Sequence, residues 1–558
     1  MYLINYILNI NSNTKVSDNV KYKLIGGNYS FMPIECILEN RGITKELFDL
    51  DEIVVEDYNN YDHIQEGIDL LMKHINNKNK ILLIVDSDVD GLTSSAIFYN
   101  YLKEIYPDID IKYKLHTGKQ HGLSEDIIIN NDIELVIIPD ASSNDFKQHK
   151  ELQNRGIDVL VIDHHLCDEG YSPYAVVINN QLSKNVTNKN LSGAGVVYKF
   201  LKALDDYLFE SKADNYLDLV ALGNIADVMD LHEKETRYFV YEGIKNVSNL
   251  FIKALIENNS YDLEGKYNID KIGWTIAPKL NGTIRSGTAI EKVNMFKAFI
   301  SNNYNFCLET AKKCKNAKAR QDREVKKTMN ELLNVIEILD TDRCLMIKVD
   351  DKLNKNHIGL VAGKLADKFG LPTLIYRDWN KDLIGGSGRG IENISNDFRQ
   401  DLLNSELITM AQGHESAFGF SLNKNKVDEL KKHLDELYKD KVVTNNKEYK
   451  VDFNLDINEL EIDFVNEVAQ LENEWGNKID APLIHISNIK LESDSVQVKA
   501  KTNIVFYSNY IKFIKKFATN ILKEELIGNE LHIDIIGKIT MDNYTKNGQV
   551  EIVDIEIK

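Results

Sequence analysis

The sequence predicts an α/β fold: a parallel-sheet domain, a long linker helix, a smaller second α/β domain and a small C-terminal β-barrel. Strand-length apolar runs alternate with helical patterns early in the chain, namely Ile81–Val85, Thr93–Tyr106, Ile133–Pro139, Phe146–Arg155 and Val159–Ile162. Such alternation is typical of a parallel sheet with helical crossovers. Strands and helices alternate again from Cys344, and the final part of the chain alternates apolar with polar residues, as in a barrel or sandwich.

Length and composition limit the class of protein. The 558 residues suffice for three or four domains at about 150 residues each, and 43% of them are hydrophobic, which indicates a folded chain. No apolar run approaches the roughly 20 residues that span a bilayer, and the N-terminus lacks a signal-peptide pattern. We therefore expect no membrane association. The cysteines form no CxxC pair, which favours a cytoplasmic location: Cys36, Cys167, Cys307, Cys314 and Cys344.

The charge is strongly acidic, with 67 basic and 86 acidic residues and a net charge of −19. This disfavours a protein that coats nucleic acid through its overall field, but it is compatible with carboxylates that bind metal ions. The segment 311–327 is the exception, with eight basic and two acidic residues. We expect a long helix there, and two interpretations stay open: a solvated surface or a face that follows a DNA backbone.

The remaining elements flank these segments. A short helical pattern lies within Phe31–Asp51, and an amphipathic helix is predicted over Tyr61–Ile75. An apolar helix is predicted over Leu217–Val228. The second α/β region is predicted from Cys344–Val349, Ile358–Phe369, Thr373–Tyr376 and the glycine-rich stretch Gly385–Gly390. A polar junction at Asn445–Lys450 then precedes the barrel.

Acidic clusters follow each of the three predicted strands of the first sheet. They are Asp86, Asp88 and Asp90, then Asp140, then the triplet Asp163, His164 and His165. The carboxyl ends of parallel strands meet at one edge, where α/β folds bind ligands, so these side chains should converge. Each cluster alone could be a turn or a helix cap. Together they would repel one another strongly without divalent cations.

The donor types indicate the metal. Carboxylates with one or two imidazoles and no thiolate suit manganese or magnesium, and bridging carboxylates allow two ions that activate water and stabilise a phosphoryl displacement. A calcium-binding EF-hand loop is excluded, because the position that would need Glu holds Ile97. Asp140, alone at the end of the central strand, is the natural bridging carboxylate.

These motifs resemble those of the DHH phosphoesterase superfamily, and most closely its RecJ branch of single-stranded-DNA exonucleases. The resemblance covers nearly the whole chain and rests on VDSDVDGLTSSA, PDASSND, VIDHH, DLVALGNIADVMD, APKLNGTIRSG, GLVAGKLADKFGLP, GGSGRG, AQGHESAFGF and the EWGNKIDAP and HIDIIGKI segments. Three positions depart from the family pattern: Gln412, Glu474-Trp475 and Gly282. They indicate a divergent, phage-like member.

The resemblance implies a role for each candidate residue. The expected metal ligands are Asp86, Asp88, Asp90, Asp140, His164 and Asp227. We assign catalytic roles to Asp140 and to His165, which either ligates metal or donates to the phosphate. The expected substrate-binding residues are Asn281 and Arg285 in a loop, Ser387 and Arg389 in the glycine-rich stretch, and Gly413 and His414.

The resemblance also implies domain boundaries. They are an N-terminal extension over 1–75, a DHH domain over 76–310, a basic linker helix over 311–335, a DHHA1 domain over 336–440 and an OB-fold over 441–558. In the last of these, aromatic residues among lysines could bind DNA or belong to the core: Phe506, Tyr507, Tyr510, Phe513, Phe517, with Lys499, Lys501, Lys512, Lys515 and Lys516.

The expected function is a 5′-to-3′ exonuclease that uses two manganese or magnesium ions to hydrolyse single-stranded DNA to mononucleotides in DNA repair or recombination. Its partners would be single-stranded DNA and a single-strand-binding protein or helicase. Alternatives are an oligoribonuclease or cyclic-dinucleotide phosphodiesterase, a non-catalytic replication or recombination scaffold, and a phage protein that targets host factors. The sequence leaves open the polarity, the DNA-over-RNA preference, the preferred ion and the oligomeric state.

Overall fold

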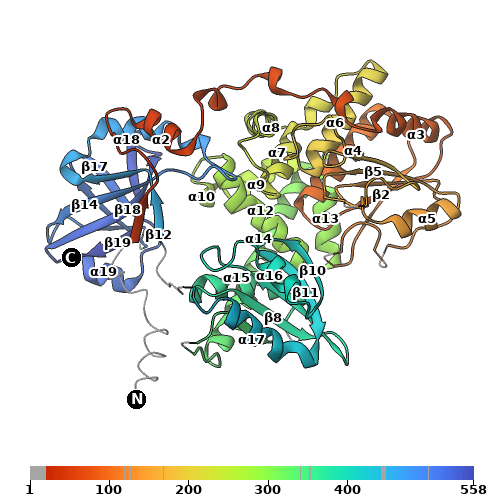
Figure 1. Cartoon of the computed structure of the whole chain (residues 1–558). Helices are drawn as coiled ribbons and strands as arrows, with labels where there is room; N and C mark the ends of the chain where they lie inside the picture. Colours follow the sequence, from red (N-terminus) through yellow and green to blue (C-terminus); the bar gives the residue numbers. More distant parts are fainter. Residues whose placement is uncertain are drawn as a thin grey trace.

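The computed structural model describes residues 21–558 except 119, 125–126, 168, 340, 351–352, 442–447 and 501. The N-terminal residues considered for a signal peptide, the first half of the predicted polar junction (445–447) and Lys501 lie outside the described residues. Four sheets organise the chain, and Figure 1 shows a first α/β unit, a second α/β unit and a C-terminal sheet as separate bodies around a central helical region. No described helix combines the length and apolar character needed to cross a membrane.

The first α/β unit holds a five-stranded parallel sheet in the order β3-β2-β4-β5-β6. The strands are β2 (Ile81–Val85), β3 (Ile111–Leu115), β4 (Leu135–Pro139), β5 (Asp158–Asp163) and β6 (Val176–Asn179). The central strands β2 and β4 are wholly buried, as their continuous apolar sequences predict. The edge strands β3 and β6 were missed: Lys112 and Lys114 interrupt the apolar residues of β3, and β6 is only four residues long.

Helices cover this sheet and extend beyond it. They are α3 (Ile64–Asn76), α4 (Val89–Ile105), α5 (Phe146–Asn154), α6 (Gly193–Leu208), α7 (Leu217–Ala226), α8 (Lys234–Lys245), α9 (Leu250–Asn258), α10 (Ser260–Leu263), α11 (Ile269–Lys271), α12 (Ala277–Ser286) and α13 (Ala289–Phe299). Helix α4 begins before the predicted Thr93, because the Asp88 side chain caps it by accepting from the Gly91 amide at 2.8 Å.

The second α/β unit has a mixed sheet in the order β10-β11-β9-β8-β7. Its elements are β7 (Leu345–Lys348), α15 (Ile358–Phe369), β8 (Thr373–Asp378), β9 (Leu383–Arg389), α16 (Phe398–Asn404), β10 (Ile408–His414), β11 (Ala417–Asn423) and α17 (Val427–Leu437). The glycine-rich stretch therefore forms most of strand β9. A Cβ on Gly386 would lie 2.0 Å from the Ile375 carbonyl oxygen, which explains why glycine is needed there.

Helix α14 (Tyr304–Leu333) joins the two α/β units. It starts before the predicted basic segment. Its first half contributes Ala311 and Cys314 to the core of the first unit, and Val325 packs in the core of the second unit with Val361. The basic linker is thus anchored by apolar packing at both ends.

The C-terminal unit is an open seven-stranded sheet in the order β13-β14-β18-β19-β17-β16-β15. Its elements are β13 (Phe453–Asp456), α18 (Ile462–Ala469), β14 (Leu483–Leu491), β15 (Gln497–Lys499), β16 (Asn503–Ser508), β17 (Ile511–Lys515), α19 (Asn520–Leu526), β18 (Leu531–Met541) and β19 (Gly548–Ile557). The predicted barrel is not closed among the described residues, because the edge strands β13 and β15 are not paired with each other. The Asn28 side chain instead bonds the Asn454 backbone amide and carbonyl of β13.

The N-terminal residues pack on this C-terminal unit before the chain crosses to the first one. Strand β1 (Lys21–Leu24) pairs in parallel with β12 (Glu448–Val451), and α2 (Pro33–Arg41) follows. Short 3₁₀ turns then lead to α3: η1 (Lys45–Phe48), η2 (Glu52–Val54) and η3 (Tyr58–Asn60). Figure 1 shows this segment, in red to orange, running along one side of the molecule from the C-terminal unit to α3.

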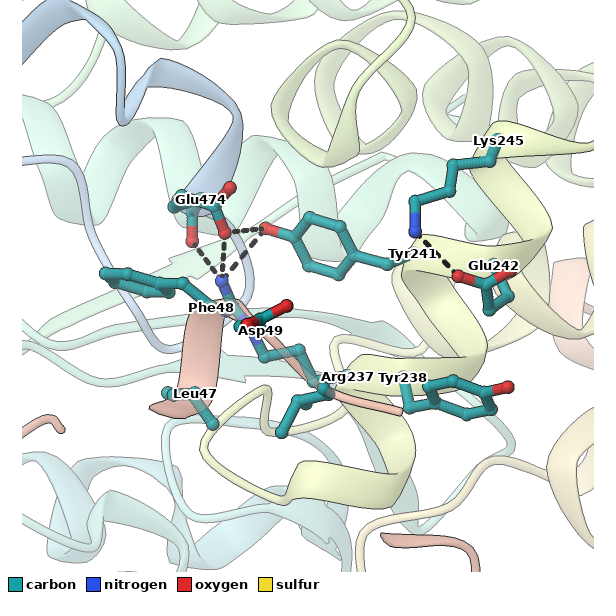
Figure 2. A pocket seen from close by; sticks show the side chains of 10 residues that line it. Leu47, Phe48, Asp49, Arg237, Tyr238, Tyr241, Glu242, Lys245 and Glu474 are labelled. Carbon is teal, nitrogen blue, oxygen red and sulfur yellow. Dashed lines mark hydrogen bonds and ion pairs between the residues drawn. The ribbon is translucent and has the colours of Figure 1, made fainter. Parts of the chain in front are cut away.

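A small pocket of about 80 Å³ marks the place where three parts of the chain meet. In Figure 2 the Arg237 side chain of α8 reaches Glu474, with Phe48 of the N-terminal segment beside it. The Arg237 guanidinium lies 2.7 Å from the Glu474 carboxylate and 5.0 Å from the centre of the Phe48 ring. This buried cation ties the first unit to both the N-terminal segment and the C-terminal unit.

Candidate metal centre

The predicted acidic clusters converge at the carboxyl ends of the parallel strands. Asp86 follows β2, Asp140 follows β4, and His164 follows β5. Asp88 and Asp90 lie at the start of α4, and Asp227 caps the C-terminal end of α7. The ends of β2, β4 and β5, the start of α4 and the end of α7 therefore bring all six predicted ligands to one site.

His164 lies at the centre of this cluster. Its Nε2 atom is 3.2 Å from Asp140 Oδ1, 3.6 Å from Asp227 Oδ2 and 3.8 Å from Asp90 Oδ2. Burial, followed by the charge of His165, lowers the pKa of His164, so its imidazole is neutral at pH 7 and can act as a ligand. A second group forms beside it, in which ligand atoms of Asp86, Asp88 and His121 lie within 4.8 Å of one another.

The backbone is shaped to hold the carboxylates this close. Asp140 adopts a left-handed conformation with φ 67°, which L-residues rarely adopt. A Cβ on Gly193 would lie 2.4 Å from Asp140 Oδ1, so glycine leaves room for that carboxylate. The Gly193 and Ala194 amides, at the start of α6, donate to Asp90 at 2.6 and 3.1 Å. The helix N-terminus thereby offsets part of the negative charge.

Protein groups balance the remaining charge only in part. Both carboxylate oxygens of Asp140 are buried and accept no hydrogen bond among the described residues. Burial, followed by the neighbouring carboxylates, raises the pKa of Asp140 well above its usual value and that of Asp227 to about 8. An oxygen-rich donor set with orphaned acceptors and a neutral imidazole fits divalent cations of the manganese or magnesium type.

Asp163 has a different role from the other carboxylates. It accepts from the His164 amide at 2.7 Å and from the Ser143 amide at 3.0 Å, and it lies 2.8 Å from His165 Nδ1. Burial alone would lower the pKa of His165, but the Asp163 charge and hydrogen bond raise it to about 10. Asp163 therefore orients the imidazole of His165 and keeps it protonated at neutral pH.

Two arginines approach the acidic cluster. Arg285 lies on helix α12 with Asn281, so the predicted loop is wrong. Pro278 occupies the first turn of this helix, where proline is tolerated, and Gly282 permits close packing against Lys318 of α14. Burial lowers the pKa of the Arg285 guanidinium, and the Asp88 carboxylate opposes this effect.

Arg389 comes from the second α/β unit. It lies on β9 beside Gly359, whose Cβ would be 2.7 Å from Arg389 Nη2 and 3.5 Å from Ser387 Oγ. Burial, followed by the charge of Arg285, lowers the pKa of Arg389, so the two cations face one another across the units. Neutral hydrogen bonds hold this junction: Ser286 Oγ is 2.6 Å from His357 Nε2, and Asn356 donates to the Arg285 carbonyl at 3.1 Å.

The last two predicted residues lie at the end of β10. Gly413 has φ 129°, and its carbonyl accepts from Arg399 at 2.8 Å; His414 pairs across the hairpin with Ala417. These residues share the sheet of Ser387 and Arg389, two strands from β9. Gly413 and His414 therefore lie in the second α/β unit with Ser387 and Arg389 rather than in the acidic cluster.

Comparisons with known proteins agree with this arrangement. A family model described as "DHH family, N-terminal domain" matches residues 80–224. YorK of Bacillus subtilis (strain 168), named as a putative SPbeta prophage-derived single-strand DNA-specific exonuclease, is 36% identical over 96% of this chain and 98% of its own length. This chain belongs to the DHH family.

More distant DHH proteins match as well. RecJ of Bacillus subtilis (strain 168), named as a single-stranded-DNA-specific exonuclease, is 27% identical over 67% of this chain and 47% of its own length. The crystal structure of RecJ in complex with Mn²⁺ from Thermus thermophilus superposes with a TM-score of 0.76 at 19% identity, covering 97% of this chain and 80% of that one. The likeness shows that this DHH chain shares the RecJ fold.

The sequence analysis missed one residue of the DHH site. His121 lies in the loop after β3, and its Nδ1 atom is 2.5 Å from Asp86 Oδ2. The Gly122 amide donates to Asp86 Oδ1 at 3.0 Å, so this loop covers the first carboxylate. A histidine in a loop carries no periodic signal, and the missed strand β3 is what brings it to the edge of the sheet.

Proposed function

We propose that this protein is a metal-dependent exonuclease that hydrolyses single-stranded DNA. The observation that carries the proposal is the buried, unbonded carboxylate of Asp140, surrounded by ionisable ligands, with Arg285 near Asp88 and Arg389 near Arg285. Such a site offers divalent cations on one side and phosphate-binding cations on the other. The names of YorK and RecJ supply the substrate class.

The residues divide the chemistry between them. Asp86, Asp88, Asp90, Asp140, His164 and Asp227 would hold two manganese or magnesium ions, with His121 as a further candidate. Bound there, these ions supply Lewis acidity and lower the pKa of water. Protonated His165, oriented by Asp163, donates to a phosphate oxygen, and Arg285 and Arg389 bind the phosphate through charged hydrogen bonds. Ser387, Asn281, Gly413 and His414 would position the strand end.

The proposal includes finer points. Degradation runs from the 5′ end and releases mononucleotides, in DNA repair or recombination in the cytoplasm. The second α/β unit holds the strand end as a DHHA1 domain does, and the C-terminal unit binds the strand further on. A single-strand-binding protein or a helicase supplies the strand. We also propose that the chain divides into the five domains given above, beginning with the extension over 1–75 and ending with the OB-fold over 441–558.

One experiment tests the proposal directly. The protein is incubated with 5′-labelled or 3′-labelled single-stranded DNA and RNA of equal sequence, with manganese, magnesium or EDTA. We expect the 5′ label to appear first as a mononucleotide, from DNA only, in either metal but not in EDTA. A small-substrate phosphodiesterase would cleave only dinucleotides, and a scaffold would cleave nothing.

A further inference from the structure

Four aromatic side chains of unusual exposure lie near the boundary between the first α/β unit and the C-terminal unit. We name them the aromatic track: Tyr261 (84% exposed), Trp274 (80%), Phe517 (82%) and Tyr544 (95%). Single exposed aromatic residues are common on protein surfaces. Four exposed aromatic residues from distant segments that gather at one boundary are less common and indicate a binding surface.

A single residue brings these segments together. Glu264, which caps α10, lies 2.8 Å from Lys271 and 2.9 Å from Lys516, and its carbonyl accepts from Asn543. Tyr261 precedes Glu264 by three residues, and Trp274 follows Lys271 by three residues. Phe517 and Tyr544 are the immediate neighbours of Lys516 and Asn543. Each residue of the track is therefore within three residues of a side chain that meets at the Glu264 ion-pair junction.

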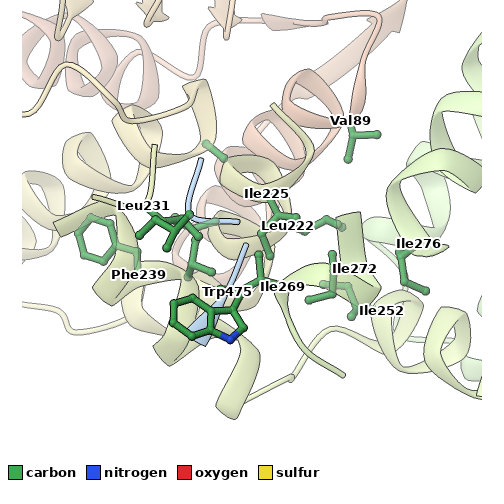
Figure 3. Close-up of a cluster of buried hydrophobic side chains, with 14 of the residues drawn as sticks. Val89, Leu222, Ile225, Leu231, Phe239, Ile252, Ile269, Ile272, Ile276 and Trp475 are labelled. Carbon is green, nitrogen blue, oxygen red and sulfur yellow. The ribbon is translucent and has the colours of Figure 1, made fainter. Parts of the chain in front are cut away.

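Trp274 connects this junction to the metal centre. It lies in a π-helical turn, Ile272–Ile276, between α11 and α12, and such turns are frequent at functional sites. Figure 3 shows Ile272 and Ile276 among buried side chains with Leu222 and Ile225 of α7. The buried side of the turn thus packs on the helix that ends at Asp227, while Trp274 stays exposed.

Trp274 lies in the turn directly before the helix that carries the proposed phosphate-binding side chains. Asn281 and Arg285 are four residues apart on α12 and share one face. Trp274 is exposed and Asn281 and Arg285 are half-buried, whereas Leu280 and Ile284 are buried. At 1.5 Å per residue of α-helix, Ala277 lies about 12 Å along α12 from Arg285, and Trp274 lies in the π-helical turn before Ala277, a distance of a few nucleotides.

The charges of this region indicate how a strand would be held. Lys271 and Lys516 are paired with Glu264, and Lys279 and Lys315 are paired with Asp262. Lys516 also lies 3.1 Å from Glu551, so these four cations share three carboxylates and most of their charge is offset within the protein. Exposed rings bind the faces of bases whatever their sequence, and each stacked base contributes substantially to affinity.

We propose that the aromatic track is a base-stacking site for single-stranded DNA whose end lies in the metal centre, with Trp274 nearest the cleaved end. This inference rests on the proposed exonuclease function and adds where the strand runs beyond Arg285. Binding at the track depends on stacking and not on counterion release, so its loss lowers affinity without changing the salt dependence.

The test uses binding of a 20-nucleotide single strand in an Asp140→Asn background, which prevents cleavage. Trp274→Ala should weaken binding about 5- to 100-fold, the range for one lost stacking contact, whereas Trp274→Phe should retain most affinity. Phe209→Ala is the matched control, because Phe209 is as exposed but lies beyond the C-terminal end of α6, whose N-terminus contacts Asp90. Wild-type fluorescence should be quenched by the strand, and Trp274→Phe should remove most of that change.

The outcomes separate this inference from the proposed function. With Asp140 intact, Trp274→Ala should raise the KM for the 20-nucleotide strand and leave kcat and the cleavage of a trinucleotide unchanged. Unchanged affinity and fluorescence response in the Trp274 variants, alongside wild-type cleavage of single strands, would overturn the track alone. If the wild-type protein cleaved no single strands in manganese or magnesium, the proposed function would be overturned. The track would then also lose its proposed ligand, the single-stranded substrate.

Discussion

At the scale of single residues, the unbonded carboxylate of Asp140 has opposite consequences for function and stability. Burial raises its pKa, which means that the charged form is disfavoured in the metal-free protein. Asp140→Asn should abolish hydrolysis, because a bridging carboxylate is lost, and it should raise the melting temperature of the protein in EDTA. Activity above a few per cent of wild type in manganese would contradict the two-metal assignment.

Arg389 is the side chain of the second α/β unit that we propose binds the phosphate. Its replacement by Ala should weaken strand binding and lower the rate, by about 1–3 kcal/mol for a lost charged hydrogen bond. Equilibrium binding and single-turnover rates measure the two effects. Lys147→Ala, which removes an exposed cation of α5, is the control. If Arg389→Ala bound and cleaved like the wild-type protein, the glycine-rich strand would have only a structural role.

His149 makes stability depend on pH away from the metal centre. Burial lowers its pKa to about 4, and its ring nitrogens lie 3.2 Å from Ser142 Oγ and 3.1 Å from Ser172 Oγ. The neutral form is favoured in the folded state, so its contribution is complete above about pH 6.5 and is lost as the pH falls towards 4.

The expected effect of His149 is at most about 3 kcal/mol in the free energy of unfolding. His149→Gln should flatten the decline of stability between pH 6.5 and 4, as measured by urea unfolding at each pH. His532→Gln, at an exposed position, should leave the wild-type decline unchanged. An equal decline in the His149 variant would show that other groups cause the acid sensitivity.

At the scale of elements, the basic face of α14 is only partly available to DNA. Lys315, Lys318, Arg320 and Lys327 form ion pairs with carboxylates. Lys312 and Lys313 are exposed and are not in an ion pair among the described residues. The double variant Lys312→Gln/Lys313→Gln should therefore reduce the slope of log K against log salt by about 1.4 units, about 0.7 for each lost phosphate contact on a single strand.

A matched pair of lysines controls this experiment. Lys147 and Lys150 are at the surface on α5 of the first unit, so Lys147→Gln/Lys150→Gln changes the net charge equally. The α5 variant should keep the wild-type slope. Equal slopes for all three proteins would leave the solvated-surface interpretation of 311–327.

Elements that are buried on both faces could be predicted from the sequence. Features that depend on contacts with distant parts of the chain could not. The residues of β2 and β4 are continuously apolar, so these strands and the carboxylates that follow them were predicted. Strand β3 was missed because Lys112 and Lys114 interrupt its apolar residues. Arg285 was assigned to a loop because of Pro278 and Gly282, whose roles in starting α12 and admitting α14 depend on tertiary contacts. The open C-terminal sheet depends on Asn28, 426 residues from its partner.

At the scale of the whole molecule, the N-terminal segment is part of the C-terminal unit. The Arg41 guanidinium lies 2.7 Å from the fully buried Asp452 carboxylate, and the two side chains share two hydrogen bonds. Arg41→Ala leaves that carboxylate buried without its cation, which typically costs about 3–5 kcal/mol. Hydrogen exchange at Tyr22 and Tyr449 should increase in this variant.

A double-mutant cycle checks the attribution to this ion pair. Arg41→Ala/Asp452→Ala should be less destabilised than the sum of the single variants, because no uncompensated charge remains buried. Additive effects would mean that the two side chains act independently. Deleting 441–558 would also remove the partner of β1 and α2, so that truncation does not test the C-terminal unit alone.

The ion pair between Arg41 and Asp452 can form only late in biosynthesis, after Asp452 has been made. Its members are 411 residues apart, and a ribosome adding about 5–20 residues per second needs about 20–80 s to make the second after the first. During that time the segment from β1 to α2 has no partner, although the first α/β unit can already fold beside it. The nascent N-terminus is therefore a natural client for chaperones that bind exposed apolar segments. Codon changes that slow translation after residue 41 should reduce the yield of intact protein through proteolysis of this end.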